Sequence, residues 1–210
     1  MRMWRTLKQF IAGLFGSQPT PSTDSASRKS GARPSRGVIF RATTPFLAHV
    51  REDLMRPHAF AHERVGFITV RAAQGAESIV LIADNYYPVA DEDYLEDFTV
   101  GAMIGQEALR KALQLALLKG VGVFHVHMHA LTPGLWFSSV DLREQVKFVP
   151  DFFSVCPQMP HGAIVLNAKT AAGRVWLARD HVENIQEFDE VGSRLIVNRA
   201  AADGSTDFYV

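Results

Sequence analysis

The chain has 210 residues, of which 47% are hydrophobic, and a formal net charge of zero. This length suits one globular domain with an appendage, or at most two small domains. A neutral chain has no bias towards nucleic acid, so no nucleic-acid partner is expected. The single cysteine, Cys156, excludes an internal disulfide and a zinc-finger ligand set. We therefore expect a cytoplasmic protein.

Charge and apolar residues are unevenly distributed at the N-terminus. Residues 1–36 hold seven basic side chains and one acidic one, which leaves 15 basic and 21 acidic side chains, a net of about −6, in the remainder. Residues 1–16 predict an amphipathic helix, because apolar residues recur at helical spacing and basic residues lie off that stripe. This helix either packs on its own domain or contacts a partner or a membrane surface. A secretory signal is disfavoured, because the apolar core is short and interrupted.

Residues 17–36 are rich in Ser, Pro, Gly and charge, and they predict a disordered linker. The folded domain is therefore expected over residues 37–210. No apolar run approaches the roughly 20 residues that span a bilayer.

The predicted elements of the domain alternate between strands and helices. A strand over 37–43 precedes a helix over 44–55, with Thr44 as N-cap and Pro45 at the first position. Residues 65–72 and 78–89 predict a hairpin. The strongest helical pattern, 102–120, closes at Gly120. The remaining predicted elements are a buried strand over 121–127, a short helix over 138–149, a hairpin over 161–180 and a strand over 193–198. This order predicts one α/β domain, a mixed β-sheet flanked by helices.

Three histidines, His125, His127 and His129, occupy alternate positions at the end of a predicted strand. Alternate side chains of a strand point to one face, and each two-residue step spans about 6.6–6.8 Å. Zinc ligands lie only about 2.0–2.1 Å from the metal, so adjacent histidines of the three can converge on one ion. His125 and His129, roughly 13 Å apart in an extended strand, cannot. The pair is therefore 125/127 or 127/129; alternatively, the histidines cap the strand and bond to carboxylates.

Ser138 and Asp141 predict a helix N-cap with an acid at the third helical position. This cap follows the histidines by one short loop, at the start of a helix that can face the strand end. Asp141 is therefore a candidate third ligand. Two histidines and a carboxylate leave a fourth position for water, as in catalytic rather than structural zinc sites.

Together these residues resemble the JAMM (JAB/MPN) zinc metalloprotease family, in the style of its bacterial members from ubiquitin-like systems. The family motif is His-x-His, usually followed by Pro, then about seven residues to Ser-x-x-Asp, with a glutamate on an earlier segment. The matching residues are Glu63, His127, His129, Ser138 and Asp141. Ala130 stands where Pro is usual, and eight residues separate His129 from Ser138. The pair 125/127 would make that gap ten, so His125 is expected to support the ligands from behind or to be an alternative ligand.

The resemblance covers most of 37–180 and implies an MPN/JAB fold of cytidine-deaminase-like architecture. It implies Zn²⁺ held by His127, His129 and Asp141, with Glu63 as general base and Ser138 bonding the water or the oxyanion. The implied activity is that of an isopeptidase or peptidase cleaving after the C-terminus of a ubiquitin-like protein. Implied partners are that protein or its conjugate and the ubiquitin-activating-like and conjugating-like enzymes of the same system, which in some relatives serves antiviral defence. The alternative is a catalytically inactive MPN-type scaffold.

Two aromatic residues are candidates for substrate contact. Trp136 and Phe137 lie in the predicted loop between the histidines and Ser138. Exposure in a loop would indicate a partner surface, whereas burial would indicate core packing. The substrate tail itself is expected to bind in extended form along a sheet edge.

Overall fold

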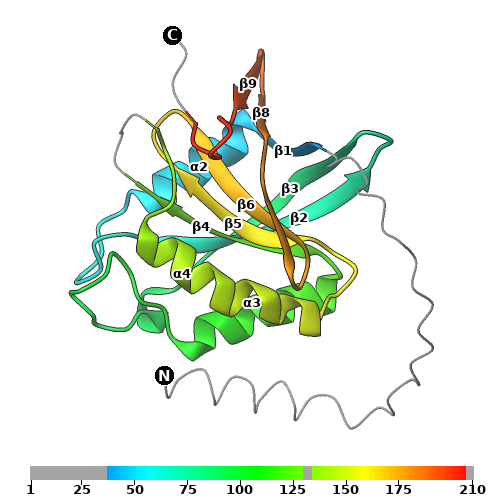
Figure 1. Cartoon of the computed structure of the whole chain (residues 1–210). Helices are drawn as coiled ribbons and strands as arrows, with labels where there is room; N and C mark the ends of the chain where they lie inside the picture. Colours follow the sequence, from blue (N-terminus) through cyan, green and yellow to red (C-terminus); the bar gives the residue numbers. More distant parts are fainter. Residues whose placement is uncertain (1–36, 130–133, 207–210) are drawn as a thin grey trace, which may run out of the picture. The chain divides into compact units, whose positions relative to one another are not determined.

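The computed structural model describes residues 37–129 and 134–206. Within them, nine strands form one sheet in the order β7-β6-β5-β4-β2-β3-β1-β8-β9 (Figure 1). The predicted helix over 1–16 and the predicted linker over 17–36 lie outside the described residues. In the part of the chain that is described, no helix is long and apolar enough to cross a membrane.

The elements follow the sequence in this order. The strands are β1 (Gly37–Thr43), β2 (Val65–Gln74), β3 (Ser78–Pro88), β4 (Gly122–Met128), β5 (His161–Leu166), β6 (Ala171–Ala178), β7 (His181–Asn184), β8 (Glu187–Val191) and β9 (Leu195–Arg199). The α-helices are α2 (Thr44–Leu54), α3 (Gln106–Lys119) and α4 (Ser139–Phe148). Two 3-10 helices, η1 (Asp91–Asp93) and η2 (Val149–Ser154), complete the described elements.

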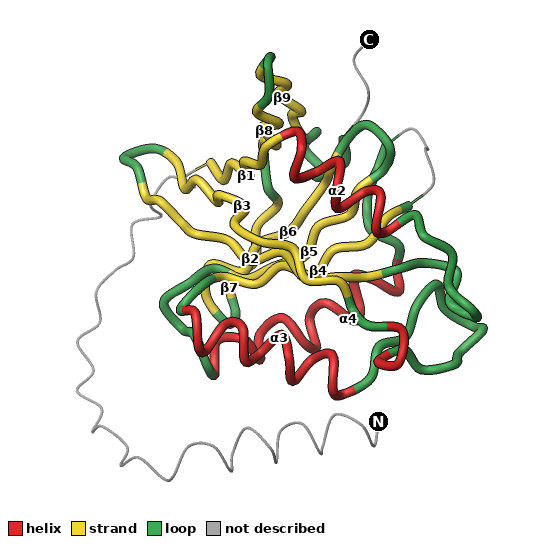
Figure 2. The backbone as a smooth tube through the Cα atoms, turned by 180° about the vertical axis from the view of Figure 1, so that it is seen from behind, coloured by secondary structure: helices red, strands yellow, loops and turns green. Residues whose placement is uncertain are grey.

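The sheet is mixed. Strand β1 runs parallel to β3 and β8, and β4 runs parallel to β5, while the other neighbouring pairs are antiparallel. The helices lie on both faces of the sheet: α2 covers one face, and α3 and α4 lie on the other (Figure 2). The predicted α/β class with a mixed sheet is confirmed.

Two strands, β7 and β8, were not predicted from the sequence. Strand β8 is acidic, and acidic residues are depleted in strands. In the structure the Asp189 carboxylate of β8 pairs with Arg41 of the neighbouring strand β1, and Glu190 Oε2 lies 3.3 Å from Arg51 Nη1 of α2. These ion pairs neutralise the charges that obscured the strand pattern.

The main apolar core lies between the sheet and α2. It includes Leu47, Val50 and Leu54 of α2 and inward residues of seven strands, among them Phe40, Ile68, Leu81, Phe124, Val126, Ile164, Leu166, Val175 and Phe188. Because Phe124 and Val126 point to the α2 face, the alternation of side chains turns His125 and His127 to the opposite face. The sheet thus separates the histidines from the main core.

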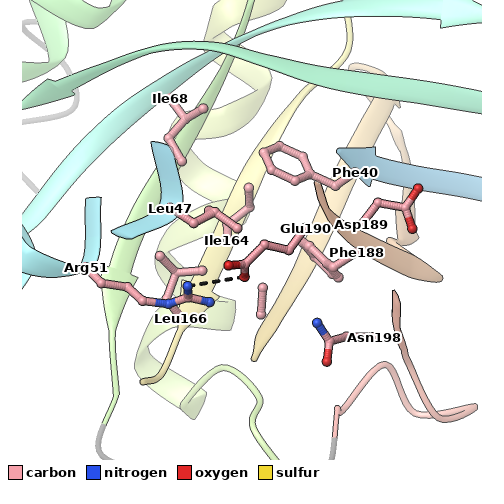
Figure 3. A pocket seen from close by; sticks show the side chains of 11 residues that line it. Phe40, Leu47, Arg51, Ile68, Ile164, Leu166, Phe188, Asp189, Glu190 and Asn198 are labelled. Atoms are coloured by element: carbon pink, nitrogen blue, oxygen red, sulfur yellow. Dashed lines mark hydrogen bonds and ion pairs between the residues drawn. The ribbon is translucent and has the colours of Figure 1, made fainter. Parts of the chain in front are cut away.

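A small pocket on the α2 face illustrates this separation (Figure 3). Apolar residues form most of its wall, and the ion pair between Arg51 and Glu190 lies beside them. The lining includes Phe40, Leu47, Ile68, Ile164, Leu166, Phe188 and Asn198. None of these residues lies on the histidine face, so this pocket is separate from the candidate site.

Two predicted helix starts need correction. The N-cap of α2 is Thr43 rather than Thr44, since the Thr43 hydroxyl accepts a hydrogen bond from the Phe46 amide at 3.3 Å. Helix α3 begins at Gln106 rather than near residue 102. The preceding residue, Gly105, donates its amide to the Asp93 carbonyl at 2.7 Å, and this bond holds the chain extended up to the helix.

Candidate metal centre

The pairing of β2 with β4 determines which residues meet at the end of the histidine strand. Val65 is directly opposite His127 in this antiparallel pair. Val65 is the first residue of β2, and Glu63 lies two residues before it, in the bend that leads into the strand. The His129 amide continues the ladder towards β5 with a 2.9 Å hydrogen bond to the Leu166 carbonyl. Because the first residue of β2 pairs with His127, the segment that leads into β2 brings Glu63 close to His127 and His129.

Three donor atoms form a compact triangle at this point. His127 Nε2 and His129 Nε2 lie 3.1 Å apart, and Asp141 Oδ2 lies 3.5 Å from each of them. Glu63 offers a further ligand atom, and the donor atoms of Glu63, His127 and His129 lie within 4.8 Å of one another. His127 is 1% exposed, while His129, Glu63 and Asp141 are half-buried. Glu63, His127 and His129 form a group that can hold a metal ion, and Asp141 lies beside the two histidines.

The N-terminal cap of helix α4 positions Asp141 beside the histidines. The Ser138 hydroxyl accepts a hydrogen bond from the Asp141 amide at 3.2 Å. In return, the Asp141 carboxylate accepts hydrogen bonds from the Ser138 amide at 2.8 Å and from its hydroxyl at 2.7 Å. This reciprocal capping box satisfies free amides of the first turn, and it fixes the carboxylate beside the histidines. The predicted N-cap at Ser138 is confirmed.

The site stabilises the ionised form of Asp141. Burial alone would raise the pKa of this carboxyl, but hydrogen bonds from His127, His129 and Ser138 outweigh burial and hold the pKa well below its usual range. The hydrogen bond with Asp141 raises the pKa of His129 against the opposing effect of burial, and Glu63 adds to the rise. A metal cation bound by the carboxylate and the two imidazoles would neutralise the carboxylate charge, as protons on the imidazoles do without a metal.

The orientation of His129 depends on the loop before α4. A hydrogen bond to the backbone of Trp136 also contributes to the raised pKa of His129. Because His129 Nε2 faces His127 and Asp141, the nitrogen that bonds the Trp136 backbone is Nδ1. A ligand histidine whose other nitrogen donates to a carbonyl has a fixed tautomer and ring orientation.

Gly101 determines the position of Glu63. The Gly101 carbonyl accepts hydrogen bonds from the amides of His62 at 2.8 Å and of Glu63 at 3.0 Å. A Cβ atom on Gly101 would lie 2.6 Å from Glu63 Oε2 and 2.7 Å from its Cδ, closer than real Cβ contacts. The Glu63 carboxylate thus lies directly against Gly101, and any side chain at position 101 would displace it.

A buried arginine holds the chain between α2 and β2. Arg64, 4% exposed, bonds the carbonyls of Arg56 and Pro57 at 3.0 Å each and pairs with Asp91 at 2.7 Å. The hydrogen bond with Asp91 raises the pKa of Arg64. This residue precedes β2 directly, so its bonds fix the direction in which the neighbouring Glu63 leaves the strand.

His125 lies beside the ligand cluster rather than within it. Its ring packs edge-on against Phe67 at 5.8 Å and Phe148 at 5.4 Å between centroids, and lies 5.5 Å from the ring of His127. Burial lowers the pKa of His125 to about 3, so the ring is neutral near pH 7. The group of possible metal ligands, Glu63, His127 and His129, does not include His125.

Leu135 and Phe137, which flank Trp136 in the site loop, are buried. Phe137 is 6% exposed and packs with Leu135, Ala163, Val165 and Ala172, with its ring 6.0 Å from that of His127. The proposed substrate contact at Phe137 therefore needs correction, because its side chain fills the core under the site. Trp136 is half-buried and its ring lies against Gly204, where a Cβ would come within 2.5 Å of it.

The sequence prediction did not include Gly101, Arg64 or Gln145 among the site residues. Gln145 follows Asp141 by one helical turn, a spacing that places both on one helix face and that was visible in the sequence. Gly101 and Arg64 carry no such local signal, because their roles depend on contacts between distant segments.

No protein-family model matches the chain. No curated protein matches it either. Among solved structures, the chain is similar to the Trichoplax adhaerens STIL N-terminal domain, with 10% sequence identity and a TM-score of 0.34. That match covers 64% of this chain and 40% of the other, so the chain spans less than half the length of that structure.

Proposed function

We propose that the domain is a zinc-dependent isopeptidase or peptidase of the JAMM type, which cleaves after the C-terminus of a ubiquitin-like protein. The supporting observation is the donor triangle of His127, His129 and Asp141, with edges of 3.1, 3.5 and 3.5 Å. Ligands about 2.0–2.1 Å from a tetrahedral zinc lie about 3.3–3.4 Å apart. The triangle therefore fits three corners of such a site with little movement.

The donor types support zinc and a hydrolytic role. Two imidazoles and one carboxylate suit zinc better than calcium or magnesium, which prefer oxygen ligands only. The same donor set with an open fourth position is found in catalytic zinc sites, where the metal lowers the pKa of a bound water to about 7.

The position of Glu63 supports a role in proton transfer. Its carboxylate lies within 4.8 Å of the ligand nitrogens, a separation that one water can bridge. We assign Glu63 as the general base that takes a proton from this water and returns it to the leaving amine. The contact with Gly101 holds the carboxylate for this role.

The hydrogen bonds of Ser138 favour a positioning role. A serine hydroxyl has one proton, and Ser138 gives it to Asp141 Oδ2 at 2.7 Å. Donation to a water or an oxyanion requires that the hydroxyl rotate away from Asp141. Ser138 therefore acts on the reaction mainly by holding the carboxylate ligand.

The substrate tail needs a path past the site. Strand β4 is paired on both sides, with β2 and β5, so the histidine strand offers no free edge. We infer that the extended tail crosses the carboxyl end of β4, between segment 94–104 and Trp136. Segment 94–104 abuts Glu63 through Gly101, and its Phe98 is 66% exposed. Phe98 and Trp136 are the apolar contacts that we propose for the tail.

This function implies a place in a conjugation system. The partners are a ubiquitin-like protein or its conjugate, with ubiquitin-activating-like and conjugating-like enzymes, and the proposed compartment is the cytoplasm. We also propose that residues 1–16 contact a membrane surface.

The test is cleavage of ubiquitin-like fusions that carry C-terminal peptide extensions. We expect cleavage after the modifier's C-terminus by the purified protein, loss of cleavage with a chelator, and recovery when zinc is added in excess. The His127→Gln variant should be inactive in all three conditions. A protein that takes up no zinc and binds a ubiquitin-like protein without cleaving it would be the MPN-type scaffold instead.

A further inference from the structure

Gln145 is a buried amide on the helix that supplies Asp141. It is 2% exposed, and it lies four residues after Asp141 and three before Phe148. Both of these neighbours contact the strand histidines: Asp141 Oδ2 lies 3.5 Å from His127 Nε2, and the Phe148 ring is 5.4 Å from that of His125. Residues with this spacing share one helix face, so Gln145 lies between the two contacts and faces β4.

Four buried polar atoms in this region have no hydrogen-bond partner among residues 37–129 and 134–206. They are Nε2 and Oε1 of Gln145 and the Nδ1 atoms of His125 and His127. A buried polar group left without a partner costs about 1–3 kcal/mol, and an orphaned one calls for an explanation such as a bound water or a functional role.

The four atoms have complementary hydrogen-bonding roles. The amide oxygen accepts and the amide nitrogen donates, while a neutral imidazole offers one N–H and one acceptor nitrogen. Zinc ligation through His127 Nε2 requires that the proton sit on Nδ1. A ligand histidine of this kind is normally held by an acceptor on its other nitrogen, and Gln145 is the unpaired buried acceptor on the helix face that covers it.

We propose that Gln145 is a positioning residue of the zinc centre. Its Oε1 accepts the Nδ1–H of His127, after a rotation of the amide or through one water, and its amide nitrogen donates to Nδ1 of His125. This bond fixes the tautomer and the ring orientation of His127 with Nε2 turned to His129 and Asp141. The inference rests on the proposed function, since it requires zinc on His127.

The test compares zinc affinity in two matched variants by competition with a chelator. Gln145→Met keeps an unbranched side chain of similar length and removes both polar atoms, while Gln114→Met makes the same change at an exposed position of α3. We expect Gln145→Met to weaken zinc binding by about 10- to 100-fold and Gln114→Met to leave it unchanged. The metal-free Gln145→Met protein should melt at the wild-type temperature or above, because an unpaired amide has been removed from the interior.

A purely structural role would produce the opposite pattern, with a lower melting temperature and an unchanged zinc affinity, and would overturn the proposal. Gln145→Glu provides a second variant, because its carboxylate accepts the same hydrogen bond. It should bind zinc within about threefold of wild type, and a loss as large as in Gln145→Met would count against the assigned acceptor. If the wild-type protein takes up no zinc, the proposed function fails as well. If wild type and Gln145→Met bind zinc equally, only this inference fails.

Discussion

Val65 is paired directly with His127 across the antiparallel strands β2 and β4. The pair lies at the start of β2, so Glu63, an acid 64 residues before His127 in the sequence, lies close to His127 and His129. The site therefore depends on strand pairing as well as on its ligand residues.

Glu63→Gln should abolish most of the cleavage while the protein still binds one zinc. The amide keeps the size of the side chain but cannot take a proton, and general base catalysis is worth about 10²–10⁴-fold in rate. Fusion cleavage and metal content would be measured on the same preparation. Glu92→Gln, which changes an exposed acid of η1, is the control. Near-wild-type cleavage by Glu63→Gln would remove Glu63 from the reaction.

Substitution of each of the three histidines should show that His127 and His129 are zinc ligands and that His125 is not. His127→Gln and His129→Gln should each prevent stoichiometric zinc binding, because each removes one corner of the donor triangle. His125→Phe should still hold one zinc per chain, since the ring of His125 packs between Phe67 and Phe148. Metal analysis after dialysis against a weak chelator checks this ranking. Loss of zinc in His125→Phe together with its retention in His129→Gln would reverse the ligand assignment.

Gly101→Ala should reduce kcat by about 10- to 100-fold, because a displacement of about 1 Å in a catalytic group can cost this much. The new Cβ would lie 2.6 Å from Glu63 Oε2, so the carboxylate must move. KM and zinc content should change by less than about threefold. Gly37→Ala is a suitable control, since a Cβ there meets nothing within 4 Å. Equal kcat values in the two variants would show that the position of Glu63 does not depend on Gly101.

Ser138→Ala should lower the free energy of unfolding by about 1 kcal/mol, the usual value of an N-cap side chain. It should also weaken zinc binding, because the hydroxyl no longer holds Asp141 Oδ2. Ser138→Thr keeps a hydroxyl and should restore both properties in large part. Denaturant unfolding and chelator competition provide the two measurements. An unchanged zinc affinity in Ser138→Ala would confine Ser138 to helix capping.

The metal-free protein should lose stability as the pH falls below about 6.5, and His161 should account for part of the loss. His161 is fully buried; its Nδ1 accepts from the Val123 amide at 3.1 Å and its Nε2 donates to the Cys156 carbonyl at 2.9 Å. Burial lowers its pKa to about 4. Between pH 6.5 and 4 the unfolded chain binds more protons than the folded one, so the free energy of unfolding falls with pH, by about 3 kcal/mol in total.

Urea unfolding of the wild type and of His161→Gln across this pH range checks the prediction. Glutamine does not titrate, so the variant should show a flatter dependence on pH, whatever its stability at pH 7. Parallel curves for the two proteins would mean that His161 does not contribute to the acid lability.

Several local features of this protein are predictable from its amino-acid sequence. Alternation along a strand placed the three histidines on one face, and the Ser138–Asp141 spacing predicted a capping box that the structure contains. The helical pattern up to Gly120 also predicted a real helix end, where the left-handed φ of 60° suits glycine. These features depend on residues within one or two turns of each other, so the sequence pattern carries them directly.

The distant residues that complete the site are identified by contacts in the folded domain and not by the sequence pattern. The pairing of the start of β2 with β4 brought Glu63 close to the two histidines, Gly101 provided the space for its carboxylate, and the packing of α4 placed Gln145 over the strand. Strand β8 formed despite its acids because Arg41 and Arg51 lie beside it. Each of these outcomes depends on contacts between segments far apart in the chain, and such contacts leave no periodic signal within either segment.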